Sequence, residues 1–142
     1  MNSPAADIAE LLNSVGIGHI ALGSMLPSAG VGVFVGDEPP EPSECITVFG
    51  YGGTADEGLT CEEIDNFRIQ VRTRARNYAD SHKLIKAVEG QLNRLKTYEV
   101  PDGSETVSYV VIYRLNIPTE LGTDEKKRFI FTQNYAGIRQ KL

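Results

Sequence analysis

The sequence predicts an α+β fold: a two-layer sandwich in which two helices cover one face of a mainly antiparallel sheet of about four or five strands. Two segments with apolar residues at helical spacing predict the helices. Several β-branched and aromatic segments, separated by Gly and Pro, predict the strands, and one of them alternates strictly between apolar and polar residues. At 142 residues the chain has the length of one domain, so we expect residues 1–142 to form a single one.

The first helix is predicted to begin at Pro4. Ser3 is a favourable N-cap, and proline fits the first helical position, where its missing N–H is not needed. The apolar residues that follow at helical spacing are Ile8, Leu11, Leu12 and Val15. Gly16 and Gly18 then end a short amphipathic helix.

The next part of the chain is predicted to alternate between loops and short strands. Residues 19–30 are irregular, and residues 31–35 form a short strand. The prolines of residues 37–42 cannot donate ladder hydrogen bonds, so this acidic tract is a stiff loop. Residues 45–51 form a second strand that stops at the following Gly-Gly pair, and residues 54–63 form an acidic loop.

The clearest alternation in the chain begins at Ile64. The side chains expected on the apolar face are Phe67, Ile69, Val71 and Thr73, and those on the opposite face are Arg68, Gln70, Arg72 and Arg74. Asn77 is a favourable N-cap for a second helix over residues 78–96, whose apolar stripe should lie on the sheet.

The remaining chain is predicted to form two long strands. A Pro-Asp-Gly turn at 101–103 precedes a strand over residues 107–117, which Pro118 interrupts. A polar turn at 123–127 leads into the last strand, residues 128–135, which pairs back as a hairpin partner.

Charge is segregated along the chain. The formal net charge is −5. Residues 37–65 hold nine acidic residues and no Lys or Arg, whereas residues 66–96 hold eight basic residues and two acidic ones. Two interpretations stay open: two solvated faces of one fold, or an acidic surface of one copy that meets the basic surface of the next. Contacts of the second kind close into rings or continue as filaments.

The sequence offers no recognisable catalytic or metal site, so we expect neither enzyme activity nor a cofactor. His19 and His82 lie near no nucleophile motif. Cys45 and Cys61 are too few for a disulfide framework, and their spacing from the histidines is not a zinc signature. The acidic composition argues against a general nucleic-acid or membrane binder, and no apolar run approaches the length of a membrane span.

The strongest candidate for a binding surface is the basic row on the polar face of the alternating strand. It consists of Arg68, Gln70, Arg72 and Arg74, extended by Arg76. Side chains at every second position project about 7 Å apart, and guanidinium groups bind carboxylates or phosphates through paired hydrogen bonds. The row lacks interleaved aromatics, so it suits an acidic protein partner better than a nucleic acid. The alternative is a solvated outer face.

Two segments, taken in order, resemble a known family. They are FRIQVRTRARNYADSHKLIKAVEGQL (67–92) and LNIPTELGTDEKKRFIFTQNYAGIR (115–139), the second with Pro118, Leu121-Gly122, Asp124-Glu125, Arg128 and a closing Phe-x-x-Asn-Tyr. Together with the N-terminal helix and Gly52-Gly53, they make the chain similar to the minor capsid protein family of tailed bacteriophages, a relative of the tail terminators of long-tailed phages. The long loop at 37–44, and Lys127 in place of the usual glycine, depart from that pattern.

The resemblance implies a structural virion protein at the head–tail joint. It implies a homo-oligomeric ring, commonly of six subunits, that caps the completed tube of tail tube protein and presents a surface to the head-completion or connector protein. DNA would cross its channel without specific binding, and the subunits would assemble in the host cytoplasm. The basic row would then serve a neighbouring subunit or the tube. An acidic channel or rim, which repels phosphates, would comprise Asp37, Glu38, Glu41, Glu44, Asp56 and Glu57.

Other functions stay open from the sequence. A head-completion or connector protein of the same neck region shares the ring-forming habit. A small enzyme or ligand-binding module would need a deep polar pocket, and a nucleic-acid-binding module would show salt-sensitive DNA binding.

Overall fold

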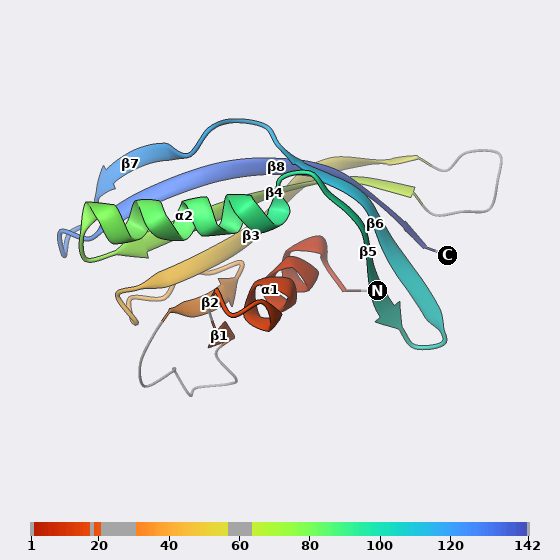
Figure 1. Ribbon diagram of the computed structural model, residues 1–142, viewed down its shortest axis with the longest axis horizontal. Helices are drawn as coiled ribbons and strands as arrows, with labels where there is room; N and C mark the ends of the chain where they lie inside the picture. The colour runs from red at the N-terminus through yellow and green to blue at the C-terminus, as the bar shows by residue number, and fades with distance from the viewer. Residues whose placement is uncertain (1, 18, 21–30, 57–63, 142) are drawn as a thin grey trace.

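The computed structural model describes residues 2–17, 19–20, 31–56 and 64–141, which form two helices and one eight-stranded sheet (Figure 1). In chain order the elements are α1 (Pro4–Ser14), β1 (His19–Ile20), β2 (Gly32–Val35), β3 (Cys45–Asp56), β4 (Ile64–Ala75), α2 (Tyr78–Leu92), β5 (Leu95–Asp102), β6 (Glu105–Arg114), β7 (Thr119–Thr123) and β8 (Phe129–Lys141). The α+β class is confirmed, but the sheet has more strands than the four or five predicted.

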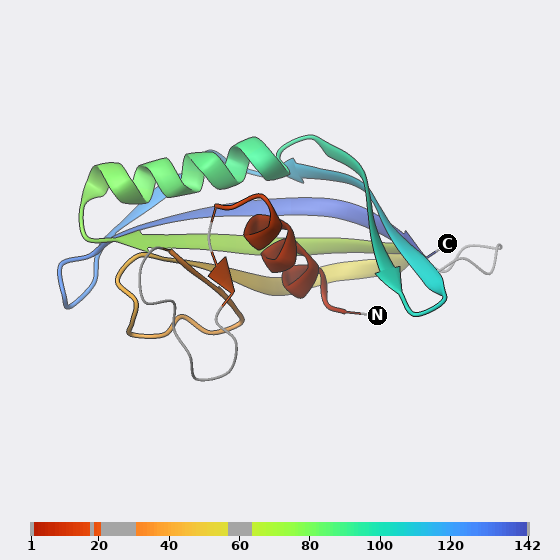
Figure 2. The ribbon, with the colours of Figure 1, turned by 60° about the horizontal axis from the view of Figure 1, so that its bottom comes forward.

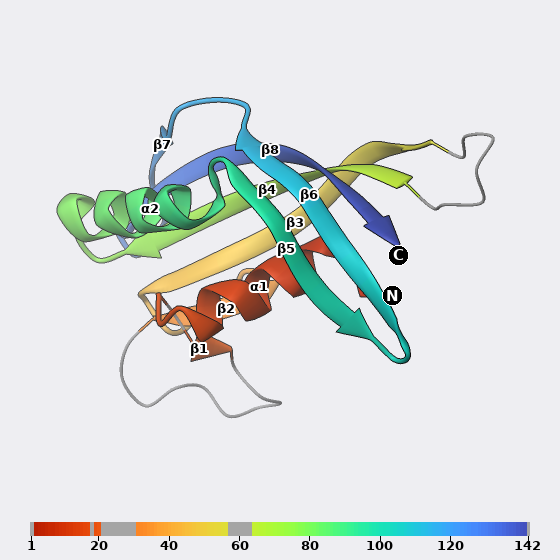
Figure 3. The same cartoon turned by 45° about the vertical axis from the view of Figure 1, so that its right-hand side comes forward.

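The sheet follows the order β1-β2-β3-β4-β8-β6-β5, and β7 pairs with β8 outside that path. β4 lies at its centre and pairs antiparallel with β3 and β8 along its length. The pairs β1–β2 and β2–β3 are parallel, and the other described pairs are antiparallel. The sheet is therefore mixed, although the predicted antiparallel pairs are the majority. The sheet curls strongly, so that β5 and β6 bend around toward α1 (Figure 3).

Both helices lie on one face of the sheet, which we term the inner face (Figure 2). The predicted alternation of β4 is confirmed, because Phe67, Ile69 and Val71 are buried against the helices in one continuous apolar core. From α1, Ile8 and Leu12 enter the same core. The opposite side of the sheet, which we term the outer face, carries no helix (Figure 1).

The helix starts agree with the sequence, but the end of the second helix does not. Ser3 caps α1, where its Oγ accepts a hydrogen bond from the Ala6 N–H at 3.2 Å, and Asn77 caps α2. The predicted helix 78–96 ends at Leu92. Arg94 has a φ of +66°, which stops helical propagation. Leu95, which continues the helical apolar spacing, instead begins β5, a strand that the sequence did not predict.

The strand predicted to stop at the Gly-Gly pair continues through it. β3 runs to Asp56, with a bulge between Gly50 and Gly53. At Gly53, φ is +121°, and an added Cβ would lie 2.4 Å from the Asn66 carbonyl oxygen. The glycines therefore bring two strands close together instead of ending one. Residues 54–56, predicted as loop, belong to β3, and residues 57–63 lie outside the described part of the chain.

The C-terminal strands also differ from their predicted bounds. β6 ends at Arg114, three residues before the predicted end, and β8 extends to Lys141. β7, which the sequence did not predict, pairs with β8 through an irregularity between Glu120 and Gly122. β1 is a two-residue strand inside a stretch predicted to be irregular. These additions are short or bulged segments, which lack the alternation that identifies a strand in a sequence.

Residues 36–44, which we term the acidic loop from here on, lie on the sheet because of the way β2 and β3 are connected. These strands are parallel neighbours, with Gly32 opposite Cys45 and Val35 opposite Val48. The connecting residues 36–44 must therefore run from the end of β2 back to the level of its first residue. This distance is the length of about three strand residues, or roughly 10 Å. A parallel connection usually needs a dozen or more residues and a helix. Here an extended, proline-rich segment makes the return directly.

Candidate functional site

The outer face brings the acidic loop and the basic row together within one chain. Arg74 lies at the centre of this contact and is 2% exposed. Its Nη2 donates to the carbonyl oxygens of Pro39 at 2.8 Å and Pro42 at 2.7 Å, and its Nε donates to the Ser43 carbonyl at 3.3 Å. Its Nη1 lies 3.3 Å from Oε1 of Glu38. One buried guanidinium thus donates to three carbonyl oxygens of the loop.

The two neighbouring arginines of the row also face glutamates of the loop. Nε of Arg72 lies 3.0 Å from Oε2 of Glu38, although the two groups are not aligned for a hydrogen bond. Nε of Arg76 lies 3.9 Å from Oε1 of Glu44. The Arg76 side chain is 75% exposed, so that pair is a weak surface contact. Glu38 is therefore held between two arginines of β4.

The turn between β7 and β8 holds the other side of the loop. Arg128 donates from Nη1 to the Pro40 carbonyl at 2.6 Å and from Nε to Asp124 at 2.8 Å. Lys126 lies 3.2 Å from the Glu41 carboxylate. The hydrogen bond from Lys126 lowers the pKa of Glu41 below its ordinary value. Sequence reasoning missed these cations, because they lie more than eighty residues from the loop and outside any alternating segment.

Arg68 and Gln70 complete the predicted row but make no contact with the loop. Arg68 is exposed, and no ion-pair partner of its guanidinium occurs among the described residues. Gln70 is half-buried and donates from Nε2 to Asn134 Oδ1 at 3.2 Å. The row thus divides in two: Arg72, Arg74 and Arg76 face acids of their own chain, whereas Arg68 remains open to a partner.

The residues predicted for an acidic channel or rim also divide. Glu38, Glu41 and Glu44 make the intrachain contacts given above, and Asp37 is exposed. The side chain of Asp56, and Glu57 as a whole, lie outside the described part of the structure.

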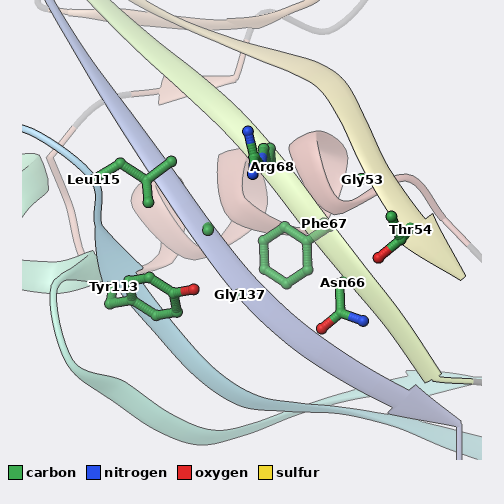
Figure 4. Close-up of a pocket in the computed structure, with 9 residues that line it drawn as sticks. Gly53, Thr54, Asn66, Phe67, Arg68, Tyr113, Leu115 and Gly137 are labelled. Carbon is green, nitrogen blue, oxygen red and sulfur yellow. The ribbon is translucent and has the colours of Figure 1, made fainter. Parts of the chain in front are cut away.

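A shallow groove lies on the outer face beside Arg68, with a volume of about 230 Å³. Figure 4 looks onto it with α1 behind the sheet; Tyr113 and Leu115 line one side, and Arg68 lies across β8 from them. Ala136 and Gly137 form part of the floor. Sequence reasoning missed this groove, because strict alternation places Tyr113 on the same face as the buried Val107 and Tyr109. The irregularity in β6 between Tyr109 and Val111 turns Tyr113 to the opposite face.

In the described residues, no group of three or more His, Cys, Asp or Glu side chains is placed so that it could hold a metal ion. Cys45 is buried, and this burial raises the pKa of its thiol to about 11. His82 is exposed on α2, with its ring stacked on Tyr78 at a centroid distance of 6.3 Å. Within the same residues, neither helix is long and apolar enough to cross a membrane.

The sequence of the chain matches a known protein family. A family model described as "Bacteriophage tail terminator protein" matches residues 11–140. Among solved structures, the chain is similar to one in "Virion of native gene transfer agent (GTA) particle", with 14% sequence identity and a TM-score of 0.45 over 76% of this chain and 78% of that chain. No curated protein matches the sequence. The match to the family model, over residues 11–140, covers all but the two ends of the chain.

Proposed function

Because the chain belongs to the bacteriophage tail terminator family, we propose that it forms a homo-oligomeric ring that caps the tail tube and joins it to the head. Members of this family are structural and not enzymatic, and the protein is a component of the virion tail. The single observation that carries the proposal is the family match over residues 11–140. The ring is a hexamer of single tail-terminator-like domains, as the resemblance of the sequence implies.

Each subunit of the proposed ring contacts its neighbour or the tube through the part of the outer face that the acidic loop does not cover. Arg68 and Arg76 are exposed, and Gln70 and Arg72 are half-buried, so these four residues can reach a neighbouring subunit or the tube. Arg74 contributes indirectly, by holding the acidic loop in place. An uncovered sheet face is available for such a contact without any rearrangement of the helices.

The partners of the ring are the tail tube protein on one side and a head-completion or connector protein on the other. DNA crosses the channel without specific binding, because an acidic protein gives phosphates few cationic contacts. Asp37, Asp56 and Glu57 of the predicted rim are proposed for this role; of these, the structure describes only the side chain of Asp37, which is exposed. The subunits are made in the host cytoplasm and end in the neck of the virion.

The test is electron microscopy of a lysate in which this gene is disrupted. Filled heads beside overlong or unjoined tails are expected. Tails of normal length beside emptied heads would instead assign the protein to head completion. Intact virions would contradict both roles.

A further inference from the structure

Exposed apolar side chains gather in the segment that includes one side of the outer-face groove. Five of the nine large apolar side chains that are exposed in the described residues lie in a twelve-residue stretch of β6, β7 and their connection: Val110, Tyr113, Leu115, Ile117 and Leu121. Tyr113 and Leu115 line the groove and are 44% and 46% exposed. Apolar groups gathered beside an exposed arginine are typical of a protein–protein contact.

The positive charge of Arg68 calls for an acidic group on the partner. The next arginines along β4, Arg72 and Arg74, are compensated by Glu38, whereas Arg68 has no acid opposite it among the described residues. A segment that fills the groove must therefore offer an apolar side chain to Tyr113 and a carboxylate to Arg68.

The hairpin of β5 and β6 offers both groups. Residues 97–105 contain three acidic residues and no Lys or Arg. On β5, Tyr98 and Val100 pack on the core, so Glu99 and Pro101 point to the exposed side of the strand. These two residues lie about 7 Å apart along the strand, close enough for Pro101 to enter the groove while Glu99 reaches Arg68. The described part of the chain pairs β5 only with β6, so its outer edge is open.

The hairpin and the groove lie on different sides of the molecule. Figures 1 and 3 show β5 and β6 bending past α1 on the helix side, whereas Tyr113 and Leu115 face away from α1 in Figure 4. A contact between two different surfaces of the same chain is heterologous, and such contacts build rings when the rotation closes. We infer that the β5–β6 hairpin of one copy docks in the Arg68–Tyr113–Leu115 groove of the next, with Glu99 against Arg68. This inference rests on the proposed ring.

The first test is cross-linking in assembled particles. Phage that lack the gene are complemented with Arg68→Cys/Glu99→Cys in a Cys61→Ser background, and purified particles are treated with a short bis-maleimide. The expected result on a denaturing gel is a ladder of covalent multimers of this chain, absent from either single-cysteine variant. Particles that yield only monomers, or a cross-link to another virion protein, would overturn the inference.

The second test reverses charge and does not depend on the cysteines. Arg68→Glu is expected to lower the titre of complemented phage about 100-fold, because like charges in contact cost several kcal/mol. Glu99→Arg should do the same, and the double variant should recover at least part of the titre. Lys83→Glu, the same reversal on the exposed side of α2, is the control and should leave the titre unchanged.

The readouts separate this inference from the proposed function. A normal titre for Arg68→Glu, with its purified monomer still folded, removes the hairpin contact. If disruption of the gene nevertheless gives overlong tails, the role as a tail terminator stands.

Discussion

Arg74 on β4 donates a 2.7 Å hydrogen bond to the carbonyl oxygen of Pro42, thirty-two residues earlier in the chain. This bond attaches the acidic loop, which connects β2 to β3, to the outer face. The same guanidinium also bonds Pro39 and Glu38 and is almost completely buried. The most basic strand and the most acidic loop therefore neutralise each other inside one chain, which leaves Arg68 as the cation of that strand available to a partner.

Removal of this guanidinium is expected to destabilise the protein. Arg74→Met keeps most of the side-chain stem but leaves Glu38 with one arginine fewer and two proline carbonyls without a donor. The expected loss is about 3 kcal/mol in the free energy of unfolding, measured by urea denaturation. Arg76→Met is the matched control and should lose less than about 1 kcal/mol, because its ion pair is exposed. Equal effects would mean that the loop is held by other contacts.

Two glycine substitutions should change stability in opposite directions. At Gly137 an added Cβ would lie 2.5 Å from Cζ of Phe67 and 2.6 Å from the Val111 carbonyl oxygen. Gly137→Ala should therefore cost about 1–3 kcal/mol through overpacking. At Gly90, within α2, an added Cβ meets no atom within 4 Å, so Gly90→Ala should stabilise by about 0.5–1 kcal/mol. Thermal unfolding of both variants measures the signs, and two destabilised variants would contradict the account of Gly90.

The sequence predicted the structure correctly where local signals and burial agree. Ser3 and Asn77 cap the helices as predicted, and the alternation of β4 assigns its inner and outer faces correctly. Charge segregation also identified the two segments that meet. It did not reveal that they meet within one chain, because that depends on β2 and β3 being parallel neighbours joined by a loop too short to go elsewhere.

Other features depend on pairings that are distant in the sequence. The pair Gly52-Gly53 is typical of a strand end. In the structure it lies in a bulge within β3, where Gly53 closely approaches the backbone of Asn66. Leu95 fits the helical spacing of α2 but is taken into β5 by pairing with Ile112. The groove at Tyr113 and Leu115 depends on the irregularity in β6 between Tyr109 and Val111, which reverses the faces that strict alternation would give.

A buried carboxylate anchors α1 to the sheet. Asp7 is 2% exposed, and its Oδ2 accepts a 2.5 Å hydrogen bond from the Tyr109 hydroxyl. Tyr109→Phe removes this donor and leaves the carboxylate underpaired, at an expected cost of about 2 kcal/mol. Hydrogen exchange should become faster in the α1 amides than in those of α2. Tyr98→Phe, in which no hydroxyl bond to Asp7 is lost, is the control; an equal acceleration there would contradict the anchoring role.

Glu89 should make stability depend on acid pH. Burial raises the pKa of Glu89, but hydrogen bonds from Lys86, Gln133 and Arg114 outweigh this effect, so the pKa lies below its ordinary value of 4.5. A pKa that is lower in the folded state adds stability above the unfolded value, and this contribution is lost as the pH falls through the folded value.

The variant Glu89→Gln isolates this contribution. It should be less stable than the wild type at pH 7, and the gap in the free energy of unfolding should shrink as the pH is lowered from 5 to 3. Urea denaturation at several pH values measures this gap. Glu120→Gln, on the exposed strand β7, should show little gap at any pH. If the gap for Glu89→Gln stays constant from pH 5 to pH 3, the charge of Glu89 does not contribute to stability, because glutamine does not titrate and any contribution of the carboxylate charge would have to appear as a change in this gap.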